Sequence, residues 1–287
     1  MNSRKILVVG AGYLGSRVLQ RLNDRGNAVA ATSRRRQKLE SWASDGIEGF
    51  RFDWCDARSY EHLPRDFDDC LIAVAYDRKS RLARHDFMVG GLRRLLSHLN
   101  QECRITMIST TGVYHQTNGE WVDETSPTHP SRDSARAHLQ AECELRAKRP
   151  QNHCVLRMSG LYGPNRLPRA NDIRQGKPIA SIRSGFLNLI HIDDAASATV
   201  AAIERNQREN LYLISDDCPV ERHFFYSRIA KLLRLPEPEY KDPKRDSPKA
   251  FRSLSDKRVW NRRMKRDLLA RLDYPTYVEG LDKILLG

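Results

Sequence analysis

The segment Lys5-Ile6-Leu7-Val8-Val9-Gly10-Ala11-Gly12-Tyr13-Leu14-Gly15 decides the fold of this 287-residue chain. Its first half is a short apolar run typical of a buried strand, and its second half has the pattern G-x-G-x-x-G. Residues 13–25 continue with apolar side chains at helical spacing, so the glycines join a strand to a helix. In this context Gly10 allows a tight turn, Gly12 lets the backbone approach a pyrophosphate, and Gly15 lets the helix pack closely on the strand.

The segment therefore predicts a turn that binds the phosphates of a dinucleotide. We expect the contacts to come from Gly10, Gly12, Tyr13, Leu14 and Gly15, because backbone N–H groups at a helix start face bound phosphates. The alternative is a glycine turn that binds no ligand.

Strands and helices alternate through the first half of the chain. Short apolar runs predict strands, and longer stretches with apolar residues three or four positions apart predict helices. The predicted strands are 4–9, 28–32, 49–52, 70–75, 104–109 and 153–157, and the predicted helices are 13–25, 37–44, 82–101 and 132–149. This alternation indicates an α/β protein with a Rossmann-type, doubly wound parallel sheet that helices cover on both faces.

The alternation of predicted strands and helices becomes irregular after residue 164, where prolines interrupt a loop-rich stretch. We divide the chain into a dinucleotide-binding domain, residues 1–164, and a smaller C-terminal α+β substrate lobe, residues 165–287, from which residues 186–204 return to the Rossmann core. Within the lobe we expect helices at 193–205 and 220–233, a strand at 211–214 and an exposed loop at 240–255.

The residues after the second predicted strand bear on the choice of cofactor. Proteins that bind NAD place an Asp or Glu there, about 20 residues after the glycines, for the ribose 2′-hydroxyl. This chain has Ser33, Arg34 and Arg35 instead. A carboxylate would repel a 2′-phosphate, whereas an arginine binds one through charge-assisted hydrogen bonds. We therefore expect NADP, with Arg34 as its main ligand, and keep NAD and a solvated basic helix start as alternatives.

Further contacts to the cofactor are expected beyond the third strand. Asp53 could accept a hydrogen bond from the adenine amino group, and an ordinary Asp helix cap is the alternative. Trp54 beside it, Ala75 at the end of the fourth strand and Ser109 at the end of the fifth complete the expected set.

Composition narrows the class of protein. The 49 basic and 36 acidic residues give a net charge of +13, but the basic residues are dispersed and carry no nucleic-acid-binding signature, so nucleic acid is not the expected partner. No apolar run approaches the ~20 residues of a membrane-spanning helix, and no secretory signal begins the chain, so we expect a cytoplasmic protein. The six cysteines form no C-x-x-C pair or zinc spacing, which favours reduced thiols and no metal site.

Several motifs together carry a family resemblance that runs from about residue 5 to 281. They are Ser109-Thr110-Thr111-Gly112-Val113-Tyr114, Glu120–Pro127, Leu156–Pro164 and Leu189–Ala196, in addition to the glycine turn. The chain resembles the extended short-chain dehydrogenases/reductases, in the branch similar to NAD-dependent epimerases and dehydratases of nucleotide sugars. The resemblance implies a nicotinamide cofactor and a small polar substrate, and it places two predicted helices, 82–101 and 132–149, where relatives form homodimers.

The resemblance also assigns catalytic positions, and two of them are replaced. Family members use a Tyr as general acid/base and a Lys four residues later, whose charge lowers the phenol pKa. Here Ser134 and His138 stand at those positions. Thr110 matches the hydroxyl residue that polarises the substrate oxygen, with Thr111 adjacent.

The missing pair leaves alternatives open. His138 could bind the nicotinamide ribose or act as an acid/base near neutral pH, or it could be a helix residue without a catalytic role. Tyr114 or Tyr162 could replace the missing phenol, although both are more often structural. Arg157, at a strand end, could face a phosphate or form a structural ion pair.

Three functions follow from these observations. The first is an NADP(H)-linked oxidoreductase or epimerase-like enzyme that acts on a small polar, nucleotide-sugar-like substrate by hydride transfer. The second is a catalytically degenerate NADP(H)-binding regulator or redox sensor, which the missing Tyr and Lys would explain. The third, weaker hypothesis is nucleic-acid binding driven by the positive charge.

Overall fold

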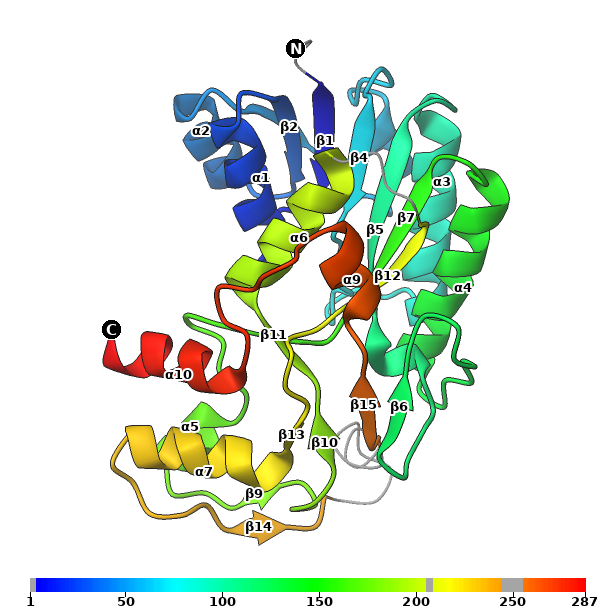
Figure 1. Ribbon diagram of the computed structural model, residues 1–287. Helices are drawn as coiled ribbons and strands as arrows, with labels where there is room; N and C mark the ends of the chain where they lie inside the picture. Colours follow the sequence, from blue (N-terminus) through cyan, green and yellow to red (C-terminus); the bar gives the residue numbers. More distant parts are fainter. Residues whose placement is uncertain (1–3, 205–208, 244–254) are drawn as a thin grey trace. The chain divides into compact units, whose positions relative to one another are not determined.

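The computed structural model describes residues 4–204, 209–243 and 255–287 (Figure 1). The chain forms two compact units that interleave along the sequence. Unit 1 comprises Met1–Val113, Pro130–Arg157 and Ala196–Tyr212, and unit 2 comprises Tyr114–His129, Met158–Ala195 and Leu213–Gly287. Among the described residues, no helix combines the length and apolar character needed to cross a bilayer.

A seven-stranded, mostly parallel sheet forms the centre of unit 1. Its order is β12-β7-β5-β4-β1-β2-β3, and the strands are β1 (Lys5–Val9), β2 (Ala28–Ser33), β3 (Glu48–Arg51), β4 (Asp69–Ile72), β5 (Arg104–Thr110), β7 (His153–Met158) and β12 (Leu211–Ile214). β1 pairs in parallel with both β2 and β4, with Leu7 opposite Ala30 and Cys70. The chain thus winds outward in both directions from β1, which confirms the predicted doubly wound fold.

Helices cover both faces of this sheet (Figure 1). α1 (Gly15–Asp24), α2 (Arg36–Ser44) and α6 (Ile192–Glu204) lie on one side, where Arg25, just after α1, forms an ion pair with Glu204 of α6. α3 (Gly91–His98) and α4 (Asp133–Lys148) lie on the other side and are joined by an ion pair between Arg93 and Glu144. Short helical turns precede α3 (η2, Asp86–Gly90) and follow β3 (η1, Ala57–Tyr60) and β5 (η3, Thr111–Val113).

The burial of apolar residues explains this arrangement. Strand residues 6–9 of β1 are at most 1% exposed, as expected for a central parallel strand covered on both faces. One large cluster in unit 1 joins alternate strand residues, such as Leu7 and Ile105, to Leu92 and Leu95 of α3 and Leu145 of α4.

Unit 2 consists of short strands and helices that pack around a separate apolar cluster. Its strands pair as β8 (Gly160–Tyr162) with β11 (Leu189–His191), β10 (Phe186–Leu187) with β13 (Val220–Glu221), β9 (Ile179–Ala180) with β14 (Tyr240–Lys241), and β6 (Glu120–Val122) with β15 (Lys257–Val259). Its helices are α5 (Ala170–Arg174), α7 (Arg222–Leu232), α9 (Arg262–Asp267) and α10 (Tyr277–Leu286). Tyr162 and Phe225, both fully buried, belong to its core.

Several predicted boundaries differ from the observed ones. A single division after residue 164 misses that residues 114–129 belong to unit 2, because β6 pairs there with β15, more than 130 residues later. The helix predicted at 82–101 has a π-helical turn at 86–90 before α3. The loop predicted at 240–255 begins with strand β14, and its residues 244–254 lie outside the described part of the chain.

Candidate functional site

The glycine turn between β1 and α1 has the geometry that its sequence predicts. Gly10 has a φ of 94°, and a Cβ there would lie 2.7 Å from the carbonyl of Ala73, so only glycine fits. The Gly12 N–H donates to the Gly10 carbonyl at 2.7 Å, which tightens the turn. A Cβ on Gly15 would collide with that same carbonyl, so Gly15 permits the close approach of α1 to β1.

Gly12 differs from its two neighbours because the fold does not require glycine there. Its φ is not in the left-handed region, and a Cβ would have no atom closer than the Gly10 oxygen at 4.0 Å. The backbone at Gly12 therefore faces open space beside the start of α1. Such a surface fits a pyrophosphate that approaches the backbone closely and uses the N–H groups at the helix start.

Lys38 of α2 adds a positive charge to this turn, a contact that no sequence motif predicts. Its Nζ donates to the Ala11 carbonyl at 2.6 Å, and the Ser16 hydroxyl donates to the same oxygen at 2.8 Å. Burial, with a smaller contribution from the charge of Arg35, lowers the Lys38 pKa. A basic residue in the first turn of the second predicted helix was the only sequence signal for it.

Arg34, the predicted ligand of a 2′-phosphate, follows β2 directly. Its guanidinium lies 2.8 Å from a carboxylate oxygen of Asp77 and 3.7 Å from one of Asp53. The hydrogen bond from Arg34 to Asp77 raises the Arg34 pKa. Ser33 does not contact this guanidinium in any described hydrogen bond; its Oγ accepts from the Arg35 N–H at 3.0 Å, and the Arg35 side chain is exposed.

These residues border an open hollow of about 440 Å³ at the ends of β2 and β3. It is lined by Arg34, Arg51, Phe52, Asp53, Asp56, Arg58 and Ser59. Asp53 also accepts from the Cys55 N–H at 3.0 Å, as an aspartate in a tight turn does, whereas the cap of the following helical turn η1 is Asp56 and not Asp53. The hollow combines three guanidinium groups with two carboxylates, a lining that suits a polar, anionic group.

The other predicted cofactor residues differ in how far their side chains are exposed. Ala75 is exposed just beyond β4. Trp54 is 5% exposed, and its ring packs against Gly91 in the core, so only its backbone is available to a ligand. Ser109 is 3% exposed, and its hydroxyl donates to the carboxylate of Glu142 in a short hydrogen bond.

Glu142 is the centre of a buried polar network that fixes α4 on the sheet. It is 1% exposed and accepts from Arg157 of β7, from Nε at 3.2 Å and from Nη2 at 2.7 Å, in addition to the Ser109 hydroxyl of β5. Arg157, itself 4% exposed, therefore forms a structural ion pair. The network ties the middle of α4 to two strands of the sheet.

His138 lies one turn before Glu142 on the same face of α4. Its Nδ1 is buried and has no hydrogen-bond partner among the described residues. Burial lowers its pKa, the charge of Glu142 opposes this shift, and the charge of Arg84 reinforces it. The imidazole is therefore neutral at pH 7, with a buried nitrogen able to take up a hydrogen bond from a ligand.

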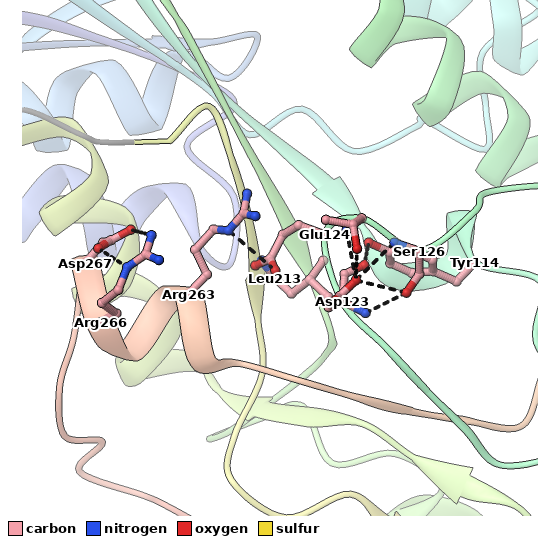
Figure 2. Close-up of polar contacts among 9 residues, drawn as sticks. Tyr114, Asp123, Glu124, Ser126, Leu213, Arg263, Arg266 and Asp267 are labelled. Carbon is pink, nitrogen blue, oxygen red and sulfur yellow. Dashed lines mark hydrogen bonds and ion pairs between the residues drawn. The ribbon is translucent and has the colours of Figure 1, made fainter.

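The remaining catalytic candidates have different surroundings. Thr110 Oγ1 accepts from the Gly112 N–H at 3.0 Å, which leaves its hydroxyl proton available for another acceptor. Thr111 is 8% exposed, and Ser134 lies in the first turn of α4. Tyr114 is 2% exposed, and its phenol donates to the Asp123 carbonyl at 2.7 Å, which is a structural role (Figure 2).

A second, smaller hollow of about 280 Å³ lies in unit 2. It is lined by Asp123, Glu124, Trp260, Arg262, Arg263 and Arg266. Figure 2 shows that several acidic and basic side chains that line this hollow pair with other groups of unit 2. Glu124 accepts from the Leu213 N–H at 2.9 Å and faces Arg263 at 3.7 Å, and Arg266 forms a two-point ion pair with Asp267. These contacts hold α9 and the loop after β6 in place, and they neutralise two of the three arginines.

Comparison with known proteins agrees with the sheet and the glycine turn. A sequence model of the NAD dependent epimerase/dehydratase family matches residues 6–215, from β1 to just past β12. Protein YeeZ of Escherichia coli K12 is 26% identical over 246 residues, which cover 83% of this chain and 87% of YeeZ.

Solved structures give the same fold. A functionally unknown conserved protein from Silicibacter pomeroyi DSS is 29% identical, with a TM-score of 0.82 and 98% of both chains covered. A dTDP-glucose 4,6-dehydratase from Bacillus anthracis, determined in complex with NAD, has a TM-score of 0.81 over 99% of this chain and 96% of its own, at 18% identity. At that identity the second likeness shows the fold alone.

Proposed function

The chain belongs to the NAD dependent epimerase/dehydratase family, and we propose that it is an NADP(H)-linked oxidoreductase or epimerase-like enzyme for a small polar substrate of the nucleotide-sugar type. The observation that carries the proposal is Gly12. Neither its φ nor its neighbours require glycine, yet its open backbone adjoins the start of α1, where a pyrophosphate binds in this fold.

In this proposal, different residues of unit 1 bind different parts of the cofactor. The turn at Gly10, Gly12 and Gly15 receives the pyrophosphate, with the charge of Lys38 beside it. Arg34 binds the 2′-phosphate, and Asp53 lies at the same end of the sheet for the adenine. When bound, the nicotinamide ring would accept or donate the hydride.

Two side chains remain for the chemistry. His138, neutral and with a buried nitrogen lacking a partner among the described residues, holds a ribose hydroxyl or exchanges a proton with the substrate. The Thr110 hydroxyl donates a hydrogen bond to the substrate oxygen and polarises it. Neither Ser134 nor the engaged phenol of Tyr114 supplies the acid that the family's tyrosine provides.

The test of cofactor binding compares Gly12→Ala with Gly90→Ala. Gly90 also has room for a Cβ, whose nearest atom would be Arg94 Nη1 at 3.7 Å, so both variants should melt within about 2 °C of the wild type. We expect NADPH fluorescence titrations to show an at least tenfold loss of affinity in Gly12→Ala and none in Gly90→Ala. Equal NADPH affinities in the two variants would contradict the proposal.

A second candidate function, an NADP(H)-binding regulator or redox sensor without turnover, is favoured by the replaced Tyr and Lys and by the structural role of Tyr114. The two functions differ in turnover. The enzyme should oxidise NADPH with at least one member of a panel of carbonyl compounds and keto-sugars, and His138→Ala should lower this activity. Tight NADPH binding without turnover on any member would favour the regulator.

A further inference from the structure

The ion pair between Arg34 and Asp77 crosses the end of β1, where the glycine turn begins. Arg34 follows β2, and Asp77 lies five residues beyond the end of β4, whereas β1 lies between these two strands in the sheet. The Arg34 guanidinium nevertheless approaches Asp77 to 2.8 Å. In this fold the adenosine half of a dinucleotide occupies the same region, outside the carboxyl ends of the strands.

Asp77 is held in position by its own turn. Its Oδ1 accepts from the Lys79 N–H at 2.9 Å, and its carbonyl accepts from the Ser80 N–H at 2.9 Å. The hydrogen bond from Lys79 and then the contact with Arg34 lower the Asp77 pKa, so the carboxylate is charged at neutral pH. Arg34 thus faces a fixed negative charge before any ligand arrives, with Asp53 as a second, more distant one.

We propose that Asp77 occupies the Arg34 guanidinium as an internal competitor of the cofactor's 2′-phosphate and thereby sets the preference between NADPH and NADH. This inference rests on the proposed function. A 2′-phosphate carries a charge of about −1.5 to −2 at pH 7 and three acceptor oxygens, so it displaces a single carboxylate from Arg34. NADH has no such group and leaves the ion pair in place.

The competition predicts a specific effect of Asp77→Asn. The amide oxygen of Asn can still accept from the Lys79 N–H, so the turn is kept while the charge is lost. An exposed ion pair shifts an equilibrium by a factor of about two to five, so NADPH and 2′,5′-ADP should bind Asp77→Asn about two- to fivefold more tightly. NADH affinity should change by less than twofold.

The matched control is Asp66→Asn. Asp66 pairs with Lys5 at 3.0 Å, at the opposite end of β1, so this variant has the same change in net charge without touching Arg34. In an Arg34→Gln background, Asp77→Asn should no longer tighten NADPH binding, because the competitor has lost its target. Calorimetric titrations of NADPH, NADH and 2′,5′-ADP measure all of these affinities, and thermal melts verify folding.

The outcomes separate this inference from the proposed function. If the wild type binds NADPH but Asp77→Asn changes the NADPH/NADH ratio no more than Asp66→Asn, the inference is wrong and the proposed function stands. If Asp77→Asn weakens NADH, then Asp77 is a ligand of the ribose hydroxyl, which also overturns the inference. If no variant binds any of the three ligands, the proposed function itself is wrong, and the inference fails with it.

Discussion

Replacing Glu142 with Gln removes the carboxylate at the centre of the buried network that joins α4 to β5 and β7. Three donors converge on Glu142: the Ser109 hydroxyl and two nitrogens of Arg157. Arg157 is 4% exposed, so the variant removes the carboxylate that pairs with its buried charge in this network. Breaking a buried pair from one side costs about 3–5 kcal/mol. A chain of this size loses about 2 °C in melting temperature per kcal/mol, so we expect a fall of about 6–10 °C.

The double variant Glu142→Gln/Arg157→Met shows whether the cost comes from breaking the Glu142–Arg157 ion pair. Removing both charges should restore at least half of the lost melting temperature, because a buried pair and an apolar replacement are often close in stability. Calorimetry and urea unfolding monitored by circular dichroism measure both variants. The reasoning is refuted if Glu142→Gln melts within 2 °C of the wild type, or if the double variant is less stable than Glu142→Gln.

Two further predictions concern unit 2 and the glycine turn. Asp216 is 1% exposed, and its burial, together with the charges of Asp217, Asp194 and Glu279, raises its pKa well above the ordinary value. Its folded form therefore keeps a proton that the unfolded form loses above about pH 3.9, so unfolding free energy should fall as pH rises from there through the raised pKa. Asp216→Asn should flatten this slope in urea titrations between pH 4 and 8, and an unchanged slope would contradict the assignment. Gly15→Ala, whose Cβ meets the Gly10 carbonyl, should lose about 1–3 kcal/mol as well as NADPH binding, in contrast to Gly12→Ala, which should lose binding alone.

Sequence patterns predicted the elements that adjacent residues encode, and they did not reveal contacts between residues far apart in the chain. Strand, turn and helix at residues 5–25 are encoded by adjacent residues, and they occur as expected. The position of His138 followed from counting along one helix. Lys38 and Asp77 were not found, because each contacts a partner at least 27 positions away across the sheet, a distance at which spacing carries no signal.

The side-chain contacts of Ser109 and Trp54 could not be predicted for the same reason, because alternation along a strand or turn does not reveal which side chains the helices cover. Ser109 instead serves Glu142, and Trp54 fills the space above Gly91. Arg157 had two equal interpretations from its strand position, and only the approach of α4 decided between them.

The geometry of α4 limits what catalysis this chain can perform. Glu142 fixes the helix on the sheet and with it His138, the position to which the family resemblance assigns a lysine. Burial lowers the His138 pKa, however, so the side chain at that position is uncharged at pH 7, where the lysine would be a cation. It can therefore bind a ribose hydroxyl or exchange one proton, but it cannot lower the pKa of a neighbouring phenol by its charge. In the proposed enzyme, a neutral His138 is therefore suited to accept a proton from a substrate hydroxyl as hydride leaves its carbon, a role that needs no phenol activated by a cation at position 138.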